Sequence, residues 1–110
     1  MISFINNSYN INLIKGLEID EGFIVKYDAD DINKKQTSLG MHTDNCHFTC
    51  SILLNSPLEF EGGGVKYAID DLVYYSNKGD MILHSHNAIH SGLEITKGKR
   101  YVLVFFLIVK

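Results

Sequence analysis

Short runs of apolar and β-branched residues, separated by polar turns, make up most of the sequence after about residue 22. Clear examples are residues 23–27, 81–84 and 101–109, whereas apolar residues spaced three and four positions apart are almost absent. Because short alternating or continuous apolar runs are typical of strands, this pattern predicts an all-β protein. Turns are expected at three glycine-containing segments, a flexible one at 61–64 and two others at 77–80 and 97–99.

Two of the predicted strands indicate where the core lies. Residues 101–109 are almost continuously apolar, which predicts a strand that is covered on both faces and lies in the middle of a sheet. Residues 47–55 alternate instead, so that Phe48 and Cys50 fall on a core side while Thr49 and Ser51 fall on a partly polar side. Many short strands at close spacing are typical of a jelly-roll sandwich or barrel.

Length and composition limit the architecture further. The chain has 110 residues, enough for a single domain, which we place at residues 1–110 with a core from about 22 to 110. Residues 10–15 are expected to form a short helix or an edge strand. With 45% hydrophobic and 21% charged residues, the composition falls in the range of globular proteins.

Charge, cysteine content and the length of the apolar runs disfavour several classes of protein. The net charge is −3 with histidine neutral and the opposite charges are interspersed, so no nucleic-acid partner is expected. The longest apolar run, residues 101–109, is too short for a membrane-spanning helix. In an extended strand the Cα atoms of Cys46 and Cys50 would lie about 13 Å apart, too far for a disulfide. Because the first residues lack a signal-peptide pattern, we expect an intracellular protein.

The triplet His42-Thr43-Asp44 is the first candidate for metal binding. Residues two apart in a strand point to the same face, so His42 and Asp44 can bind one ion. A surface loop can carry such a triplet by chance, but His90 follows downstream and offers a third ligand. Two imidazoles and one carboxylate form a facial triad, which suits Fe(II) and leaves positions open for a small organic acid and dioxygen.

A second set of histidines offers an alternative metal site. His84, His86 and His90 form a His-x-His-x-x-x-His series that could hold zinc. No predicted helix brings these three side chains together, and residues 87–88 look like a turn. We therefore expect His84 to be a core histidine or to support a metal ligand, and His86 and His47 to face solvent.

Arg100 begins the most apolar strand, ten residues after His90. A guanidinium in such a place is costly unless it has an anionic partner. A strand-end arginine that reaches out to solvent is the ordinary alternative. The position close behind a candidate metal ligand favours a second interpretation, in which Arg100 pairs with the carboxylate of a bound ligand.

These residues together resemble the Fe(II)- and 2-oxoglutarate-dependent oxygenases of the prolyl and lysyl hydroxylase type, and most closely the catalytic domain of the procollagen lysyl hydroxylases. The resemblance covers about residues 23 to 106. It rests on an ordered series of motifs: residues 23–27, His42-Thr43-Asp44, Phe48-Thr49, Leu54-Asn55, Glu61-Gly62-Gly63-Gly64, Lys78-Gly79, Leu83-His84, His90, Gly92-Leu93 and Gly98-Lys99-Arg100-Tyr101. An isolated H-x-D triplet is unspecific, whereas the ordered series is specific.

The resemblance implies a double-stranded β-helix, which is a jelly-roll or cupin-like barrel, with a minimal N-terminal extension. It also implies Fe(II), 2-oxoglutarate and dioxygen as cofactor and cosubstrates, with ascorbate as a further cofactor of such enzymes. The implied site residues are His42, Asp44 and His90 on iron, Arg100 on the distal carboxylate of 2-oxoglutarate, Tyr27 as a second hydrogen-bonding partner of that carboxylate, and Thr49 in the wall of the cosubstrate cavity. For Tyr27 a packed aromatic is the alternative, and for Thr49 an ordinary strand residue.

The implied activity is hydroxylation of a peptidyl lysyl or prolyl side chain, or of a free amino acid, with conversion of 2-oxoglutarate to succinate. Two alternatives remain open: a jelly-roll module that binds a metal or ligand without catalysis, and a cupin-like metalloenzyme such as an isomerase. Enzymes of this type usually carry a longer N-terminal helical layer, whereas this chain has scarcely twenty residues before its first predicted strand. A homodimer or a partner domain is therefore expected to cover the exposed sheet face.

Overall fold

A computed structural model describes residues 17–31, 33 and 36–109 of the chain. The elements in chain order are β1 (Leu17–Asp28), β2 (Leu39–His42), β3 (Phe48–Leu53), the 3-10 helix η1 (Pro57–Glu59), β4 (Phe60–Gly62), β5 (Val65–Tyr67), β6 (Val73–Tyr74), β7 (Met81–Ser85), β8 (His90–Gly92) and β9 (Ile95–Val109). The helix or edge strand expected at residues 10–15 lies outside the described residues. No described helix is long and apolar enough to cross a membrane.

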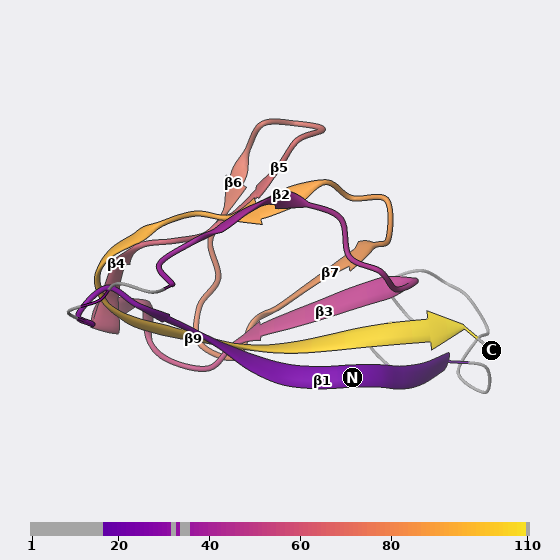
Figure 1. The fold of residues 1–110 in the computed structure, drawn as a ribbon, viewed down its shortest axis with the longest axis horizontal. Coiled ribbons are helices and arrows are strands. Elements are labelled where there is room, and N and C mark those ends of the chain that lie inside the picture. Colours follow the sequence, from indigo (N-terminus) through magenta and orange to yellow (C-terminus); the bar gives the residue numbers. More distant parts are fainter. Residues whose placement is uncertain (1–16, 32, 34–35, 110) are drawn as a thin grey trace.

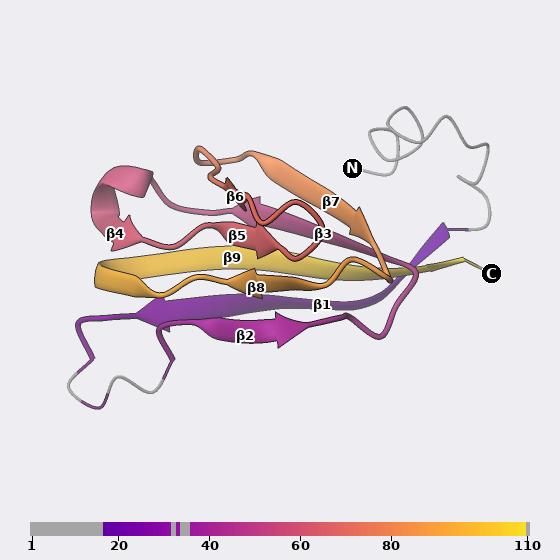
Figure 2. The ribbon, with the colours of Figure 1, turned by 90° about the horizontal axis from the view of Figure 1, so that it is seen from above.

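The strands form two antiparallel sheets that lie one above the other (Figure 1). The larger sheet has the order β1-β9-β3-β7, with β4 paired to the first part of β9, and the smaller sheet has the order β2-β8-β5-β6. Seen from above, the strands of both sheets run along the same axis (Figure 2). This arrangement is the expected double-stranded β-helix, so the all-β jelly-roll prediction is confirmed.

Strand β9 connects the two layers. Its long apolar part lies between β1 and β3, as the continuous pattern at residues 101–109 predicted. The turn expected at residues 97–99 is wrong, because β9 begins at Ile95 and runs through this segment. Gly98 has a φ of 80° and pairs with Phe60 of β4, and a Cβ atom there would overlap the carbonyl oxygen of Glu59. Glycine here permits close packing between the first part of β9 and β4. Figure 1 shows that β9 curls from one layer to the other.

Both faces of β3 contain buried residues, so the predicted core side is confirmed by the fully buried Cys50, and the partly polar side also faces the protein interior. Thr49 and Ser51, on the partly polar side, line the interior of the barrel. Cys50 is fully buried on the opposite side, where it packs with Leu107 and Phe48. Period-two alternation separates the faces of a strand, but it does not tell which face the second sheet covers.

Two further boundaries differ from the sequence prediction. Strand β1 starts at Leu17 instead of near residue 22, because its first half pairs with the end of β9 although acidic residues interrupt its apolar pattern. The glycines at residues 62–64 do not form a flexible turn. Gly62 belongs to β4, while Gly63 and Gly64 are buried, and all three have positive φ values. The turn at residues 77–80 is confirmed, with Asp80 N–H donating to the carbonyl of Asn77.

Candidate metal centre

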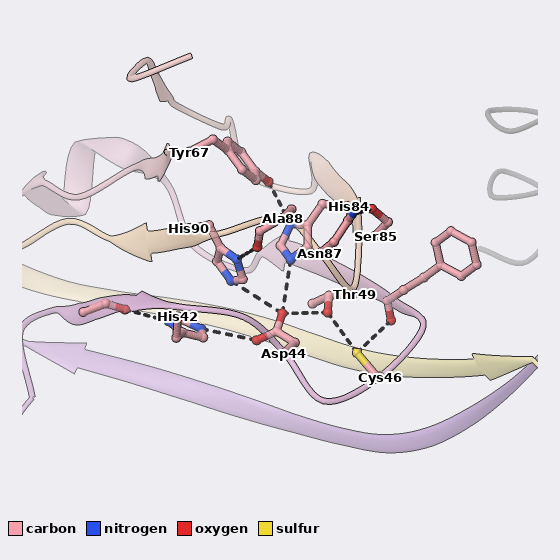
Figure 3. A network of polar contacts seen from close by, with 12 residues as sticks. His42, Asp44, Cys46, Thr49, Tyr67, His84, Ser85, Asn87, Ala88 and His90 are labelled. Carbon is pink, nitrogen blue, oxygen red and sulfur yellow. Dashed lines mark hydrogen bonds and ion pairs between the residues drawn. The ribbon is translucent and has the colours of Figure 1, made fainter. Parts of the chain in front are cut away.

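Three predicted metal ligands meet between the two sheets. His42 is the last residue of β2, His90 is the first residue of β8, and these two residues are directly paired across the antiparallel strands. Side chains of directly paired residues lie on the same face of a sheet. Asp44 lies just beyond the end of β2, in the connection to β3, and its carboxylate turns back toward both imidazoles (Figure 3). The expected convergence of His42 and Asp44 is therefore observed, although Asp44 is not itself in the strand.

The distances between these side chains suit a metal ion. Nε2 of His42 lies 3.2 Å from Oδ1 of Asp44, and Nε2 of His90 lies 3.5 Å from Oδ2. One ligand atom from each of the three residues falls in a group whose members all lie within 4.8 Å of one another. Such a group can surround one ion from one side, as a facial triad does.

The two imidazoles are also held in the tautomer that metal binding requires. Nδ1 of His42 lies 2.6 Å from the carbonyl oxygen of Gly40, and Nδ1 of His90 lies 2.8 Å from that of Ala88. A carbonyl oxygen only accepts hydrogen bonds, so Nδ1 carries the proton on each ring and Nε2 is left with its lone pair. Burial lowers the pKa of His90, which favours the neutral form that a metal needs.

Asp44 is the centre of a hydrogen-bonding network. Oδ2 accepts a hydrogen bond of 2.7 Å from the hydroxyl of Thr49, and Nε2 of His84 lies 3.1 Å from the same oxygen. Burial alone would raise the pKa of Asp44, but the hydrogen bonds from His84 and Thr49, together with the neighbouring His90, bring it to about 2. The carboxylate is therefore ionised at neutral pH and available to a cation.

A cavity of about 270 Å³ opens beside these three residues and runs into the barrel. Arg100, Tyr27, Thr49 and Ser51 line it together with His42, Asp44 and His90. Much of the remaining wall is apolar, formed by Phe23, Val25, Val65, Val102, Val104 and Phe106. All six site residues expected from the sequence thus face one cavity, although the roles given to them there stay predictions.

Arg100 is buried in this cavity, with 8% of its surface exposed. Its guanidinium carbon lies 5.1 Å from the centre of the Tyr27 ring, and among the described residues it forms no ion pair with a carboxylate. Burial lowers the pKa of Arg100 and raises that of Tyr27, while the contact between the two groups opposes both shifts. A buried cation without an anionic partner is unfavourable, so this part of the cavity is suited to an anion.

Thr49 lines the cavity, as expected, but its hydroxyl donates a hydrogen bond to Asp44. A direct contact of Thr49 with the cosubstrate stays a prediction. Tyr27 is both a packed aromatic, as its alternative interpretation held, and a neighbour of Arg100.

The alternative zinc site of His84, His86 and His90 is not assembled. His86 is exposed and is not part of the group of close ligand atoms found among the described residues. His47 is exposed too, as expected. His84 is buried, as expected for a core histidine, and lies against Asp44, so its support of a metal ligand stays a prediction.

Tyr67 is a further residue of the site that the sequence does not indicate. This residue of β5 is paired with His90 in the smaller sheet, and its hydroxyl lies 2.8 Å from Nδ1 of His84 in the other sheet. No local spacing in the sequence indicates this contact, because it crosses from one sheet to the other. The buried Gly63 was also missed as part of the site: a Cβ atom there would lie 3.3 Å from Cδ of Arg100.

Fold and site together define a class, the double-stranded β-helix proteins with a His-Asp-His group that can hold a metal ion and a buried arginine in the same cavity. A solved member of the 2OG-Fe(II) oxygenase family from Burkholderia pseudomallei shares this fold, with a TM-score of 0.79 and 20% sequence identity. The match covers 97% of this chain and 51% of that one. No protein-family model matches the chain.

The chain is similar in sequence to procollagen lysyl hydroxylases. It is 33% identical over 108 residues to the procollagen lysyl hydroxylase and glycosyltransferase of Acanthamoeba polyphaga mimivirus, covering 94% of this chain and 11% of that protein. It is 38% identical over 89 residues to the human multifunctional procollagen lysine hydroxylase and glycosyltransferase LH3, covering 77% of this chain and 12% of that protein. The resemblance found in the sequence is thus confirmed: most of the chain is similar to a short part of much longer lysyl hydroxylases.

Proposed function

We propose that this protein is an Fe(II)- and 2-oxoglutarate-dependent hydroxylase. The observation that carries the proposal is the buried Arg100, which lacks a carboxylate partner among the described residues and lines the same cavity as His42, Asp44 and His90. A cation beside a facial triad matches a ligand that has one end for the metal and a second, anionic end for the arginine.

The charges of the cavity support a dianionic ligand. A divalent metal held by two neutral imidazoles and one carboxylate keeps one positive charge, and Arg100 adds a second. The walls near Arg100 are largely apolar, so solvent would not neutralise these charges well. A dicarboxylate such as 2-oxoglutarate neutralises both charges at once, whereas a monocarboxylate leaves one of them unpaired.

Each residue of the cavity would have its own role in binding the metal or the cosubstrate. His42, Asp44 and His90 would hold Fe(II), and Arg100 would pair with the distal carboxylate through its planar guanidinium, with Tyr27 as a second donor. Thr49 keeps the Asp44 carboxylate in place, and the apolar walls exclude water from the cosubstrate. Bound Fe(II) and 2-oxoglutarate would supply oxidation by dioxygen, with succinate as the product of the cosubstrate.

We propose a lysyl side chain of a peptide as the prime substrate, because the relatives that match most of this chain are named lysyl hydroxylases. A prolyl side chain and a free amino acid are the other candidates. The chain spans only 11–12% of the length of these relatives, so the substrate has to be determined directly.

The test is turnover of 2-oxoglutarate by purified protein with Fe(II), ascorbate and dioxygen, against a panel of lysyl and prolyl peptides and free amino acids. We expect succinate in amounts that match the hydroxylated product. Under anaerobic conditions, addition of Fe(II) and 2-oxoglutarate should produce a metal-to-ligand absorption band. His42→Ala should abolish both signals, while the exposed His86→Ala should leave them unchanged.

Two outcomes would contradict the proposal. Absence of the absorption band, together with equal binding of 2-oxoglutarate by His42→Ala and wild type, would exclude the metal–cosubstrate site. Metal binding with no succinate formation from any substrate of the panel would favour the alternative of a non-catalytic module, and metal-dependent turnover without 2-oxoglutarate would favour a cupin-like enzyme.

A further inference from the structure

We infer that His84 is a positioning residue, which keeps Asp44 bound to the metal through one oxygen only. This inference rests on the proposed function, since it concerns the same metal centre. His84 belongs to β7 of the larger sheet, and 8% of its surface is exposed. Its imidazole lies between Asp44 and Tyr67 and contacts both with its two ring nitrogens (Figure 3).

Tyr67, His84 and Asp44 form a series of two hydrogen bonds, and the chemistry of Asp44 determines their direction. A metal-binding carboxylate is ionised and only accepts, so Nε2 of His84 donates to Oδ2 of Asp44 across 3.1 Å. In a neutral imidazole Nδ1 is then an acceptor, and the hydroxyl of Tyr67 donates to it across 2.8 Å. Tyr67 therefore selects the His84 tautomer that can hold Asp44.

The two oxygens of Asp44 consequently have different roles. Oδ2 accepts hydrogen bonds from both Thr49 and His84, at 2.7 and 3.1 Å. Oδ1 has neither of these donors and lies 3.2 Å from Nε2 of His42. A carboxylate whose second oxygen is engaged by two donors is disposed to bind a metal through the first oxygen alone.

Binding through one oxygen matters for the proposed reaction. Three protein ligand atoms around a six-coordinate ion leave three positions, enough for an organic acid that binds through two atoms and for dioxygen. If Asp44 bound through both oxygens, one of these positions would be lost. His84 would thus keep the third position open without touching the metal.

A direct role of His84 as a fourth metal ligand fits the structure less well. Both of its ring nitrogens are already engaged, by Asp44 and by Tyr67. The group of close ligand atoms among the described residues contains His42, Asp44 and His90 but not His84. The contacts therefore place His84 on a ligand of the metal, in the way that outer hydrogen-bonding partners orient metal ligands in other proteins.

The experiment compares four variants of the full chain with wild type, using Co(II) as a spectroscopic probe. In His84→Leu we expect the Co(II) affinity to fall by roughly 10- to 100-fold, the range for loss of such an outer partner. At saturating Co(II), its visible absorption bands should differ from those of wild type, with and without 2-oxoglutarate. His84→Gln keeps an amide N–H near the position of Nε2 and should restore both signals. Tyr67→Phe should have a smaller effect in the same direction.

The fourth variant, His86→Leu, is the matched control. His86 lies two residues away from His84 but is exposed and outside the ligand group, so this variant should bind Co(II) like wild type. Nitrogen NMR of the metal-free protein adds a readout without any metal: His84 should carry its proton on Nε2, and Tyr67→Phe should reduce the fraction of that tautomer.

The possible failures are distinguishable. Wild-type protein that binds neither Co(II) nor Fe(II) contradicts the metal centre itself, and this inference with it. Wild-type binding together with an unchanged affinity and spectrum in His84→Leu overturns only the inference. A His84 proton on Nδ1 would also overturn the inference, because Nε2 could then not donate to Asp44. So would a His84→Gln variant as defective as His84→Leu, because restoring an N–H donor would then not restore metal binding.

Discussion

Arg100 carries a charge and is buried, which is a destabilising combination unless a counter-ion lies nearby. Arg100 is 8% exposed, and its guanidinium lies beside Tyr27 and has no carboxylate partner in the described part of the chain. Fold stability alone does not favour such an arrangement, because a buried ion without its counter-ion is destabilising. The residue is better explained by a ligand that supplies the missing negative charge.

Replacement of Arg100 by methionine should therefore separate binding from stability. Loss of one partner of a buried charge pair costs about 2–5 kcal/mol, so the Kd for 2-oxoglutarate should rise at least about 30-fold. The melting temperature of the ligand-free protein should not fall, because the unpaired cation is removed. Calorimetric titration and thermal unfolding measure the two effects, and Arg100→Lys, which keeps the charge without the planar fork, should bind with intermediate affinity. A clear loss of ligand-free stability with unchanged affinity would show that Arg100 serves the fold.

Much of the candidate site can be predicted from single residues. The H-x-D triplet, His90 and Arg100 carry chemistry that is unusual in a strand, so the sequence indicates them directly. Tyr67, and the hydrogen bonds that Thr49 and His84 donate to Asp44, cannot be found in this way. Tyr67 and His84 lie 17 positions apart, Asp44 and His84 lie 40 apart, and the packing of the two sheets alone brings these residues together.

At the scale of elements, β9 determines where Arg100 lies. Its first part pairs with β4, whereas its longer part pairs with β1 and β3, so the strand passes from the corner of the barrel into the centre of the larger sheet. Gly98 lies in the part of β9 that pairs with β4, two residues before Arg100. The sequence marked the glycine as a turn because local signals do not distinguish a hairpin turn from a bend within one long strand.

Gly98→Ala should therefore destabilise the protein more than the same substitution at Gly79, a glycine with a similar backbone conformation. Gly98 and Gly79 have φ values of 80° and 88°. A Cβ atom added at Gly98 would overlap the backbone of Glu59, whereas a Cβ atom added at Gly79 would have no other atom within 4 Å. Gly79→Ala should cost about 1–2 kcal/mol from backbone strain alone. Gly98→Ala should cost clearly more and weaken 2-oxoglutarate binding, because it displaces the start of β9. Equal free energies of unfolding for the two variants in urea would contradict this account.

At the scale of the whole molecule, the Asp44 carboxylate joins the two layers. It follows β2 of the smaller sheet in the chain, and its hydrogen-bonding partners Thr49 and His84 belong to β3 and β7 of the larger sheet (Figure 3). The candidate metal centre is therefore also one of the places where the layers are held together. Protonation of one carboxyl group should loosen this connection.

The stability of the metal-free protein should accordingly depend on pH in acid. The pKa of Asp44 is about 2 in the folded protein against a model value of 3.8, so its contribution is present above about pH 4 and is lost as the pH falls toward 2. The difference corresponds to about 2 kcal/mol. Urea unfolding of wild type and Asp44→Asn between pH 5 and pH 2 measures it. The free energy of unfolding should fall less steeply with decreasing pH in the variant, and parallel curves would show that Asp44 does not make this contribution.

The sequence by itself determined the strand content, the central place of residues 101–109, and the residue types that can bind iron and a carboxylate. These properties follow from local periodicity and side-chain chemistry, which need no knowledge of the fold. Only the tertiary structure decided that both faces of β3 contain buried residues, that His84 contacts Asp44 instead of grouping with His86 and His90, and that residues 97–99 belong to β9 instead of a turn. Each of these depends on how one sheet packs on the other, and strand periodicity is the same whichever face the second sheet covers.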